Sequence, residues 1–499
     1  MHHRRKSGVL LHPTSLPGEG GIGSLGSEAC RFVDFLHSAG QSLWQVLPLG
    51  PAAYGNSPYS CYSAFAGNPL IIDLPTLVEE GDVAAFDLQS GFTNDRVDYQ
   101  KVETYKMGVL RRAAANFFGG ADEGRNSDFR QFCDAAGWLH DFALFMALKD
   151  AHHGKSWCDW PEEIARRRPD ALEEYSQKLG VTIGEVKYMQ WQFFRQWRGV
   201  KGYANGKGIE VVGDIPIFVA FDSADVWGNP HLFHLDERGR ATVVSGVPPD
   251  YFSKTGQLWG NPLYNWETVA YHGFGWWVER MRSALLLYDI VRVDHFRGFE
   301  AYWEVPAMEK TAVNGRWVKG PGEALFHALL DALGPLPIIA EDLGVITPDV
   351  EALRDRFGFP GMKILQFAFG SGPDNPYLPH NHVRDSVVYT GTHDNDTTMG
   401  WFAKLPAKEK KSIFAYLDTD GRDISWDLIR ASLASVGDTA IIPLQDILAL
   451  DSSGRMNIPG TAMGNWSWRF KADDLGAKCA KRLRELTDIY GRTQGINAG

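Results

Sequence analysis

Residues 290–296 read IVRVDHF, a short β-branched run that ends in an acid and a histidine. Seven other stretches have a similar form: 8–12 (GVLLH), 43–48 (LWQVLP), 211–219 (VVGDIPIFV), 338–343 (IIAEDL), 363–369 (KILQFAF), 387–394 (VVYTGTHD) and 440–446 (AIIPLQD). Segments long enough for helices separate them. Strands that alternate with helices predict a parallel sheet, and eight of them predict an α/β fold closed into a (β/α)8 TIM barrel.

The spacing of these runs predicts one barrel over residues 1–499 with two insertions. The long gap between the second and third runs predicts a largely helical subdomain over residues 55–205. The gap between the third and fourth runs predicts an aromatic-rich subdomain over residues 221–288, which carries the loop 247–263. Because the segment after the eighth run is short, we expect no all-β domain at the C-terminal end.

Composition indicates an ordinary globular protein. With 499 residues, 44% hydrophobic and 22% charged, the chain can form a large barrel but has no apolar run long enough for a membrane span. A net charge of -11 argues against nucleic acid as a partner, because phosphate binding needs a basic face. The 17 tryptophans offer flat rings that suit stacking on sugars, although most could simply be core residues.

The cysteine pattern and the N-terminus favour a bacterial-type cytoplasmic protein. The five cysteines are odd in number, widely scattered and without a C-x-x-C pair, which predicts neither a disulfide framework nor a zinc site. Only residues 9–11 form an apolar stretch near the N-terminus, far short of the hydrophobic region of a signal peptide.

Acids stand where several predicted strands end. Asp294 follows IVRV, Glu341 follows IIA and Asp394 follows VVYTGTH, while Asp214 follows VVG. Any one of them could be a cap or an ion-pair partner. Together they converge, because the loops after barrel strands meet in one pocket. Like charges held close in a partly dry pocket split their proton affinities, so that one carboxyl donates a proton while another stays ionised, as glycoside chemistry requires.

Basic residues flank these acids. Arg292 lies two positions before Asp294, so both side chains face the same side of a strand, and the guanidinium either keeps Asp294 ionised or forms a purely structural ion pair. His295 and His393 could donate hydrogen bonds to sugar hydroxyls or merely pack. Neither has metal-ligand spacing, and we expect no metal.

Two glycine motifs resemble nucleotide sites only superficially. Gly18, Gly20 and Gly23 satisfy G-x-G-x-x-G, but prolines separate them from the first strand and no acid follows at the ribose-binding distance. Residues 154–156 (GKS) resemble the end of a phosphate loop, but Lys149 occupies the place of its leading glycine. We therefore expect no nucleotide and no other cofactor.

Ten short motifs, in order along nearly the whole chain, give a specific resemblance. They are HPTSLPG, GNSPYS, GDIPIFV, PPDYFSKTGQLWGNPLY, VRVDHFRGF, AEDLG, LQFAF, PHN, GTHDNDT and GNWSWR. With them the chain resembles the amylomaltases, the 4-α-glucanotransferases or disproportionating enzymes of the α-amylase clan. The α-amylases usually carry an Asn-His pair where this chain has Val219 and Ala220, which favours the transferase branch.

The resemblance implies a retaining double displacement on α-1,4-glucans. Asp294 would be the nucleophile, Glu341 the general acid/base and Asp394 the acid that stabilises the transition state, with the first two carboxyls about 5 to 5.5 Å apart. A covalent glycosyl-enzyme would be resolved by the 4-hydroxyl of another glucan, a maltooligosaccharide or glucose. The implied substrate-binding residues are Tyr59 under the sugar, Asp214, Arg292 and His393 around it, and Trp259 and Asn465 on the acceptor side.

Two other functions stay open at this point. A hydrolase would send the same intermediate to water, and the three acids do not distinguish it from a transferase. A non-catalytic glucan-binding protein is the second, since a fold does not fix a function. The sequence is compatible with a monomer or a small homo-oligomer.

Overall fold

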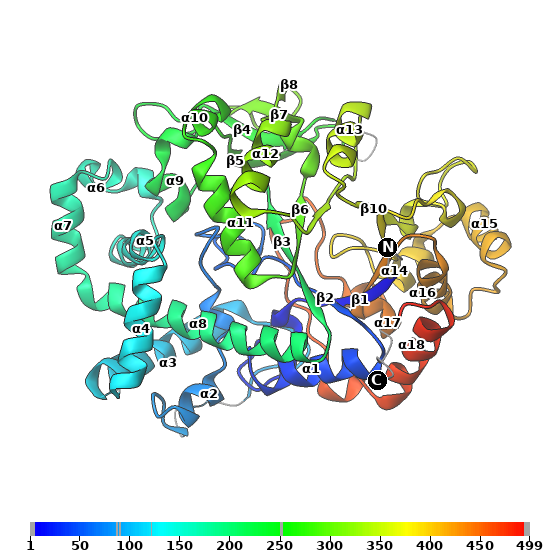
Figure 1. The fold of residues 1–499 in the computed structure, drawn as a ribbon, viewed down its shortest axis with the longest axis horizontal. Coiled ribbons are helices and arrows are strands. Elements are labelled where there is room, and N and C mark those ends of the chain that lie inside the picture. The colour runs from blue at the N-terminus through cyan, green and yellow to red at the C-terminus, as the bar shows by residue number, and fades with distance from the viewer. Residues whose placement is uncertain (1–4, 86–87, 89–90, 121, 250–252, 494–499) are drawn as a thin grey trace.

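The computed structural model describes residues 5–493 apart from 86–87, 89–90, 121 and 250–252. Its centre is an eight-stranded parallel sheet in the order β10-β11-β12-β1-β2-β3-β6-β9 (Figure 1). The backbone N–H of Ala340 donates to the carbonyl of Pro360 (3.0 Å), just before β10, which brings the two edges together. All eight predicted strands are confirmed, as β1 (Lys6–Leu10), β2 (Leu43–Gln45), β3 (Glu210–Pro216), β6 (Ile290–Asp294), β9 (Ile338–Ala340), β10 (Gly361–Ile364), β11 (Ser386–Tyr389) and β12 (Thr439–Pro443).

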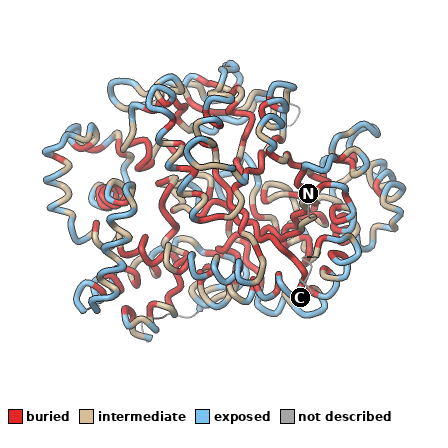
Figure 2. The backbone as a smooth tube through the Cα atoms, viewed as in Figure 1, coloured by how far each residue is buried: buried red, intermediate tan, exposed pale blue. Residues whose placement is uncertain are grey.

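The strands form at these positions because both of their faces are buried. Val211, Val291 and Val388 are fully buried, as expected for barrel strands whose inner face fills the centre and whose outer face meets helices. Between β1 and β2 the backbones come so close that a Cβ at Gly8 would lie 2.4 Å from Cβ of Leu43. Figure 2 shows the resulting buried centre, with exposed backbone at the periphery.

Several strands end earlier than their runs predict: β10 ends at Ile364, after which Leu365–Phe367 form a 3-10 helix, and β11 ends at Tyr389, well before Asp394. β9 ends at Ala340, so Glu341 already lies in the following loop. The N–H of Glu341 donates to the carbonyl of Val293 (3.1 Å), and its own carbonyl accepts from Phe296 (3.1 Å). The backbone thus stays attached to β6 while it leaves the regular ladder.

The insertion between β2 and β3 is helical and forms the arm on the left of Figure 1. The last helix of this arm also belongs to the barrel, because Trp197 packs on Trp44 of β2 (6.2 Å between centroids) and donates to the carbonyl of Leu287 (2.9 Å). The subdomain bounds 55–205 therefore stay a prediction. The helices are α2 (Leu74–Glu79), α3 (Tyr99–Gly120), α4 (Glu123–Ala135), α5 (Leu139–Ala151), α6 (Glu162–Ala165), α7 (Pro169–Lys178) and α8 (Gly180–Gly206).

The second insertion contains an antiparallel sheet that the sequence did not predict. Its order is β5-β4-β7-β8, with β4 (Val243–Val247) and β5 (Gln257–Pro262) before β6, and β7 (Ala301–Pro306) and β8 (Arg316–Lys319) after it. The subdomain predicted at 221–288 thus pairs with residues beyond that range. The helices here are α9 (Ala224–Gly228), α10 (Trp266–Tyr271) and α11 (Gly275–Leu287). Residues 250–252 of the predicted loop 247–263 lie outside the described residues.

The other helices surround the barrel (Figure 1). Within the described residues 444–493 the chain forms α17 (Leu444–Ile447), α18 (Ala477–Ile489) and short turns, with no further strand. In the part of the chain that the structure describes, no helix is long and apolar enough to cross a membrane. These helices are α1 (Ser27–Ser38), α12 (Glu323–Leu333), α13 (Pro348–Arg356), α14 (Thr398–Lys404), α15 (Ala407–Leu417), α16 (Ile424–Ala434), α17 (Leu444–Ile447) and α18 (Ala477–Ile489).

Candidate active site

Arg292 links two of the predicted site acids at neighbouring strand ends. In the register of β3 and β6, Asp214 lies opposite Arg292. Nη1 of Arg292 donates to Oδ2 of Asp214 (2.6 Å), and Nη2 donates to Oδ1 of Asp294 (3.0 Å). The side chains of Arg292 and Asp214 are buried, whereas that of Asp294 is 30% exposed. The guanidinium therefore places a positive charge against Asp294, whose side chain remains partly exposed.

Tyr59 joins the same network from the loop after β2. Its hydroxyl donates to Oδ2 of Asp214 (2.9 Å). Burial raises the pKa of Tyr59 well above its ordinary value, so the phenol stays a neutral donor. Burial also raises the pKa of Asp214, and Arg292 opposes that rise. Oδ2 of Asp214 is thus a buried acceptor that both Arg292 and Tyr59 contact.

The surroundings of Glu341 favour its neutral form, whereas Asp294 lies against a guanidinium. Oε2 accepts a hydrogen bond from the backbone N–H of His295 (2.7 Å), and Oε1 accepts one from Leu343 (3.1 Å). Loss of hydration, followed by the negative charge of Asp294, raises the pKa of Glu341 to about 8. At neutral pH Glu341 is therefore protonated, as a general acid must be.

His295 connects Asp294 to Glu341 through an unusual backbone conformation. Its φ of 54° lies in the left-handed region, which is uncommon for a residue with a side chain. Burial lowers the pKa of the His295 imidazole to about 3, so the ring is neutral. Trp259 packs edge-on against this ring, with the centroids 4.7 Å apart and an interplanar angle of 85°. The structure thus brings Trp259, 39% exposed, beside the residue that follows Asp294.

Asp394 lies in the loop after β11 and is the most exposed of the three predicted catalytic acids, with a side chain 48% exposed. Oδ1 accepts a hydrogen bond from Nδ2 of Asn457 (2.7 Å) and lies 3.4 Å from Nε2 of His393. Burial lowers the pKa of His393, and Asp394 acts against that shift. The neighbouring Asp394 is thus the group that offsets the cost of charging this buried imidazole.

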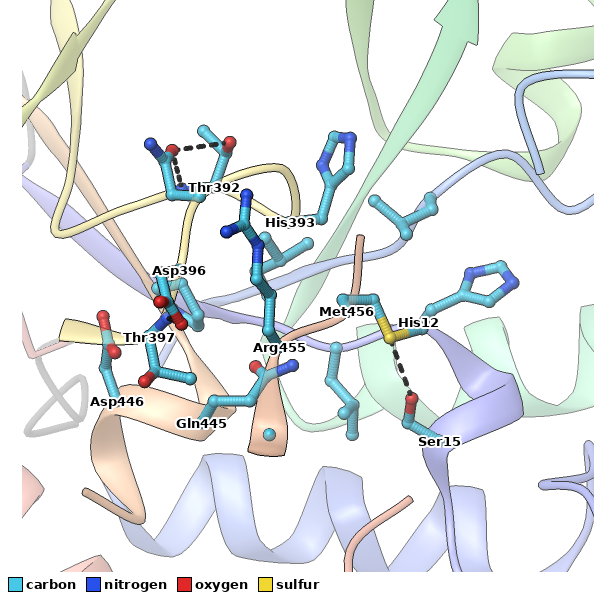
Figure 3. A pocket seen from close by; sticks show the side chains of 16 residues that line it. His12, Ser15, Thr392, His393, Asp396, Thr397, Gln445, Asp446, Arg455 and Met456 are labelled. Carbon is cyan, nitrogen blue, oxygen red and sulfur yellow. Dashed lines mark hydrogen bonds between the residues drawn. The ribbon is translucent and has the colours of Figure 1, made fainter. Parts of the chain in front are cut away.

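Aromatic rings from distant segments form one wall of the site. Tyr59 stacks on His393 with centroids 5.0 Å apart and an interplanar angle of 18°. Trp466 lies 6.0 Å from Tyr59 and 5.9 Å from His393. Figure 3 shows the adjoining pocket, where His12 and Met456 lie near His393. Flat rings of this kind suit the apolar face of a sugar.

Asn465 is the predicted residue that the structure does not join directly to the acids. Its Oδ1 accepts from the N–H of Ile458 (3.0 Å), and its Nδ2 donates to the carbonyl of Thr461 (3.0 Å). The amide therefore holds the turn between residues 458 and 465 closed. A contact between Asn465 and an acceptor sugar stays a prediction.

Sequence reasoning missed Asn457, Arg455 and Trp466. Arg455 donates through Nη2 to the backbone carbonyl of Asp394 (2.6 Å). Because these residues lie in a long loop after β12, no strand end or alternation indicates them. The only available signal was the neighbouring GNWSWR motif.

The glycine motifs form turns that are closed by local contacts. A Cβ at Gly23 would lie 1.9 Å from the carbonyl oxygen of Pro13, and Gly18 accepts a hydrogen bond from Arg469 (2.7 Å). Lys149 donates to the carbonyls of Gly154 and Lys155 (2.7 and 3.0 Å). Within the described ranges, no group of three or more His, Cys, Asp or Glu side chains is arranged to hold a metal ion.

Comparison with known proteins gives one consistent result. A family model described as 4-alpha-glucanotransferase matches residues 11–474. The 4-alpha-glucanotransferase of Synechocystis sp. is 53% identical over 499 residues, covering 99% of each chain. That of Thermus thermophilus is 51% identical over 501 residues, covering 99% of this chain and 100% of its own. The amylomaltase of Streptococcus agalactiae, solved in complex with acarbose, superposes with a TM-score of 0.96 at 41% identity over 98% of this chain and 100% of its own. The chain therefore belongs to the 4-alpha-glucanotransferase family and has the fold of an amylomaltase.

Proposed function

We propose that this enzyme transfers a segment of an α-1,4-glucan to the 4-hydroxyl of another glucan, a maltooligosaccharide or glucose, with retention at the anomeric carbon. One observation supports this chemistry above the others. Glu341 has a pKa of about 8, while its neighbour Asp294 is paired with Arg292. A carboxyl that keeps its proton at neutral pH, close to a second carboxyl that is held by a cation, is what a retaining glycosidic displacement needs.

In the first step a carboxylate oxygen of Asp294 attacks the anomeric carbon. The bond to the leaving oxygen breaks as Glu341 transfers its proton to that oxygen, and a glycosyl ester forms on Asp294. Arg292 holds the Asp294 carboxyl by a hydrogen bond before attack, and the backbone N–H of His295 holds Glu341 in place. Asp394 would bind hydroxyls of the same sugar, and the wall of Tyr59 would carry its apolar face.

In the second step Glu341, now ionised, takes the proton of the acceptor 4-hydroxyl. The acceptor oxygen attacks the anomeric carbon, the ester bond breaks and Asp294 is released. Transfer competes with hydrolysis, so the acceptor side must favour a sugar over water. Trp259 beside His295 would supply an apolar platform there, and Asn465, which holds the turn between residues 458 and 465, would line the same side.

The test is incubation of the pure enzyme with maltotriose, with products resolved by chain length. Longer maltooligosaccharides plus glucose are expected for the wild type, and none for Asp294→Asn. Release of glucose and maltose alone would identify the hydrolase instead, and no turnover of any glucan would identify the binding protein. The glycosyl ester is checked separately: Glu341→Gln incubated with an α-glucosyl fluoride should gain the mass of one glucosyl group, and the double variant with Asp294→Asn should not.

We also propose that the enzyme works in the cytoplasm as a monomer or small homo-oligomer, without a nucleic acid or membrane partner. All five cysteines are unpaired, which fits a reducing compartment. The net charge of -11 fits a neutral substrate better than a polyanion. Light scattering of the purified chain measures its oligomeric state, and a large assembly would contradict this part of the proposal.

A further inference from the structure

We propose that Asn457 is a positioning residue that sets the orientation of the Asp394 carboxylate. The proposal rests on the function proposed above, in which Asp394 stabilises the transition state. It starts from a direct contact: Nδ2 of Asn457 donates to Oδ1 of Asp394 over 2.7 Å. The two residues lie far apart in the chain, so only the fold brings them together.

Asn457 is itself fixed next to the loop that carries Asp394. Its backbone N–H donates to the carbonyl of His393 (3.2 Å), the residue before Asp394. Its backbone carbonyl accepts from Nε of Arg455 (2.7 Å). The side chain of Asn457 therefore reaches Asp394 from a backbone that is already attached to the same loop.

Arg455 closes this arrangement. While Nε donates to the carbonyl of Asn457, Nη2 donates to the backbone carbonyl of Asp394 (2.6 Å). One rigid guanidinium thus joins the two backbones. In Figure 3 the side chain of Arg455 extends toward the loop that bears His393. We refer to residues 455–457 with these contacts as the Asp394 clamp.

The clamp is supported from the GNWSWR segment. The carbonyl of Met456 accepts from the N–H of Trp466 (2.8 Å), and Ile458 donates to Oδ1 of Asn465 (3.0 Å). Trp466 in turn lies beside the stacked rings of Tyr59 and His393. The turn that the Asn465 amide closes therefore braces the clamp, which gives Asn465 an indirect role beside its predicted one.

Asp394 needs such a clamp because it lies in a loop and is half exposed. The terminal torsion of an aspartate has broad minima, so an unheld carboxylate rotates easily. The hydrogen bond from Asn457 engages Oδ1, and among the described residues Oδ2 has no partner of its own. Holding one oxygen leaves the other free for sugar hydroxyls, in a fixed plane that need not reorganise during the reaction.

The primary experiment compares kcat and KM of wild type and Asn457→Ala with maltotriose. Because Asp394 acts mainly in the transition state, kcat should fall by about 10- to 100-fold while KM changes little. Asn205→Ala is the matched control. Its Nδ2 also donates to a carboxylate, Oδ2 of Asp289 (2.8 Å), but Asp289 immediately precedes β6, at the opposite strand ends. This control should keep the wild-type kcat.

The pH profile separates positioning from general loosening of the loop. Because the Asn457 amide donates to an oxygen of the Asp394 carboxylate, its loss in Asn457→Ala should move the acid limb of kcat to higher pH. The other titratable or charged groups near Asp394 are Arg455, His393, Tyr59, Arg292 and Asp294, and these stay unchanged. In Asn457→Asp the introduced carboxyl and Asp394 share a proton. As the pH falls, the introduced carboxyl becomes protonated and can donate to Asp394 as the amide did. The kcat of this variant relative to wild type should therefore recover at low pH.

Asp394→Asn distinguishes failure of this inference from failure of the proposed function. We expect Asp394→Asn to lose most activity and the double variant with Asn457→Ala to lose no more, because the clamp acts through Asp394. Wild-type kcat and pH profile in Asn457→Ala, with Asp394→Asn inactive, would overturn the clamp alone. Full activity of Asp394→Asn would overturn the proposed role of Asp394 and the clamp with it. A fall in kcat with an unmoved acid limb would reduce Asn457 to a structural residue.

Discussion

The backbone N–H of His295 donates to Oε2 of Glu341 over 2.7 Å. The residue that follows Asp294 thus holds the carboxyl that would work with Asp294. This contact depends on the left-handed backbone of His295, whose φ is 54°. Such conformations persist where surrounding structure enforces them, and here the carbonyl of Glu341 also binds the next N–H, that of Phe296 (3.1 Å). The placement of β6 beside β9 therefore fixes the relative positions of the two carboxyls that we propose to be catalytic.

The protonated state of Glu341 predicts how stability and activity depend on pH. The folded pKa, about 8, exceeds the usual 4.5, so the stability that comes from the buried neutral acid is complete below about pH 4.5 and is lost as the pH rises toward 8. Glu341→Gln has no ionisable group at this position and so removes this loss. Its free energy of unfolding at pH 8 should therefore exceed that of wild type by at least about 1 kcal/mol. Urea unfolding at pH 5 and pH 8 measures the difference.

In Glu341→Gln, activity should change in the opposite sense to stability. The first displacement needs protonated Glu341, so the rate of wild-type turnover should fall as the pH rises through about 8. Glu341→Gln should have almost no turnover of maltotriose at any pH. A variant with equal stability to wild type at both pH values, or a wild-type rate that keeps rising above pH 9, would contradict the raised pKa.

The barrel and the three acids could be predicted from sequence because they obey local rules. Each strand is a short buried run, and Asp294, Glu341 and Asp394 follow three of them. The Arg292 contact with Asp294 follows from the two-residue alternation of a strand. The second contact of Arg292, to Asp214 on β3, could not be derived from the sequence. It depends on the register between β3 and β6, which is known only once the strands are paired.

The clamp and the antiparallel sheet were missed for physical reasons. Asn457 and Arg455 act from a loop without periodicity, and their partners lie far away in the sequence. β5 is largely exposed, so its hydrophobic pattern is weak, and its sheet is completed by strands on the other side of β6. Sequence patterns report burial and local turns, whereas these features depend on contacts between separate segments.

Arg292 offers a test of the buried ion pair. Arg292→Ala leaves the fully buried Asp214 without its cation, so we expect a loss of about 3 to 5 kcal/mol in unfolding free energy and a loss of nearly all activity. Arg292→Lys keeps the charge but cannot donate to both carboxylates at once. Compared with Arg292→Ala, it should therefore restore much of the unfolding free energy but little of the activity. Arg195→Ala, which removes a partly exposed pair with Glu80, should cost at most about 1 kcal/mol. Equal effects of the Ala variants at positions 292 and 195 would contradict this account.

Tyr59 allows the hydroxyl and the ring to be separated. Tyr59→Phe removes the hydrogen bond to Asp214 but keeps the stack on His393, so kcat should fall by about tenfold or less, the equivalent of one hydrogen bond. Tyr59→Ala removes the ring as well and should raise KM for maltotriose and lower kcat further. Steady-state kinetics on both variants provide the measurement. Equal kinetics in the two would show that the ring does not contact the sugar.

Trp259 is expected to influence the choice between a sugar acceptor and water. Its ring lies beside His295 and is 39% exposed, so it can cover an acceptor sugar and displace water from the same space. Trp259→Ala should therefore increase the fraction of glycosyl-enzyme that reacts with water, while Trp259→Phe, which keeps a flat ring, should stay near wild type. The readout is the ratio of new reducing ends to total glycosidic bonds broken, since transfer creates no net reducing ends and hydrolysis creates one per bond. If Trp259→Ala lowered the overall rate without changing this ratio, Trp259 would serve the packing of β5 and His295 rather than the partition between transfer and hydrolysis.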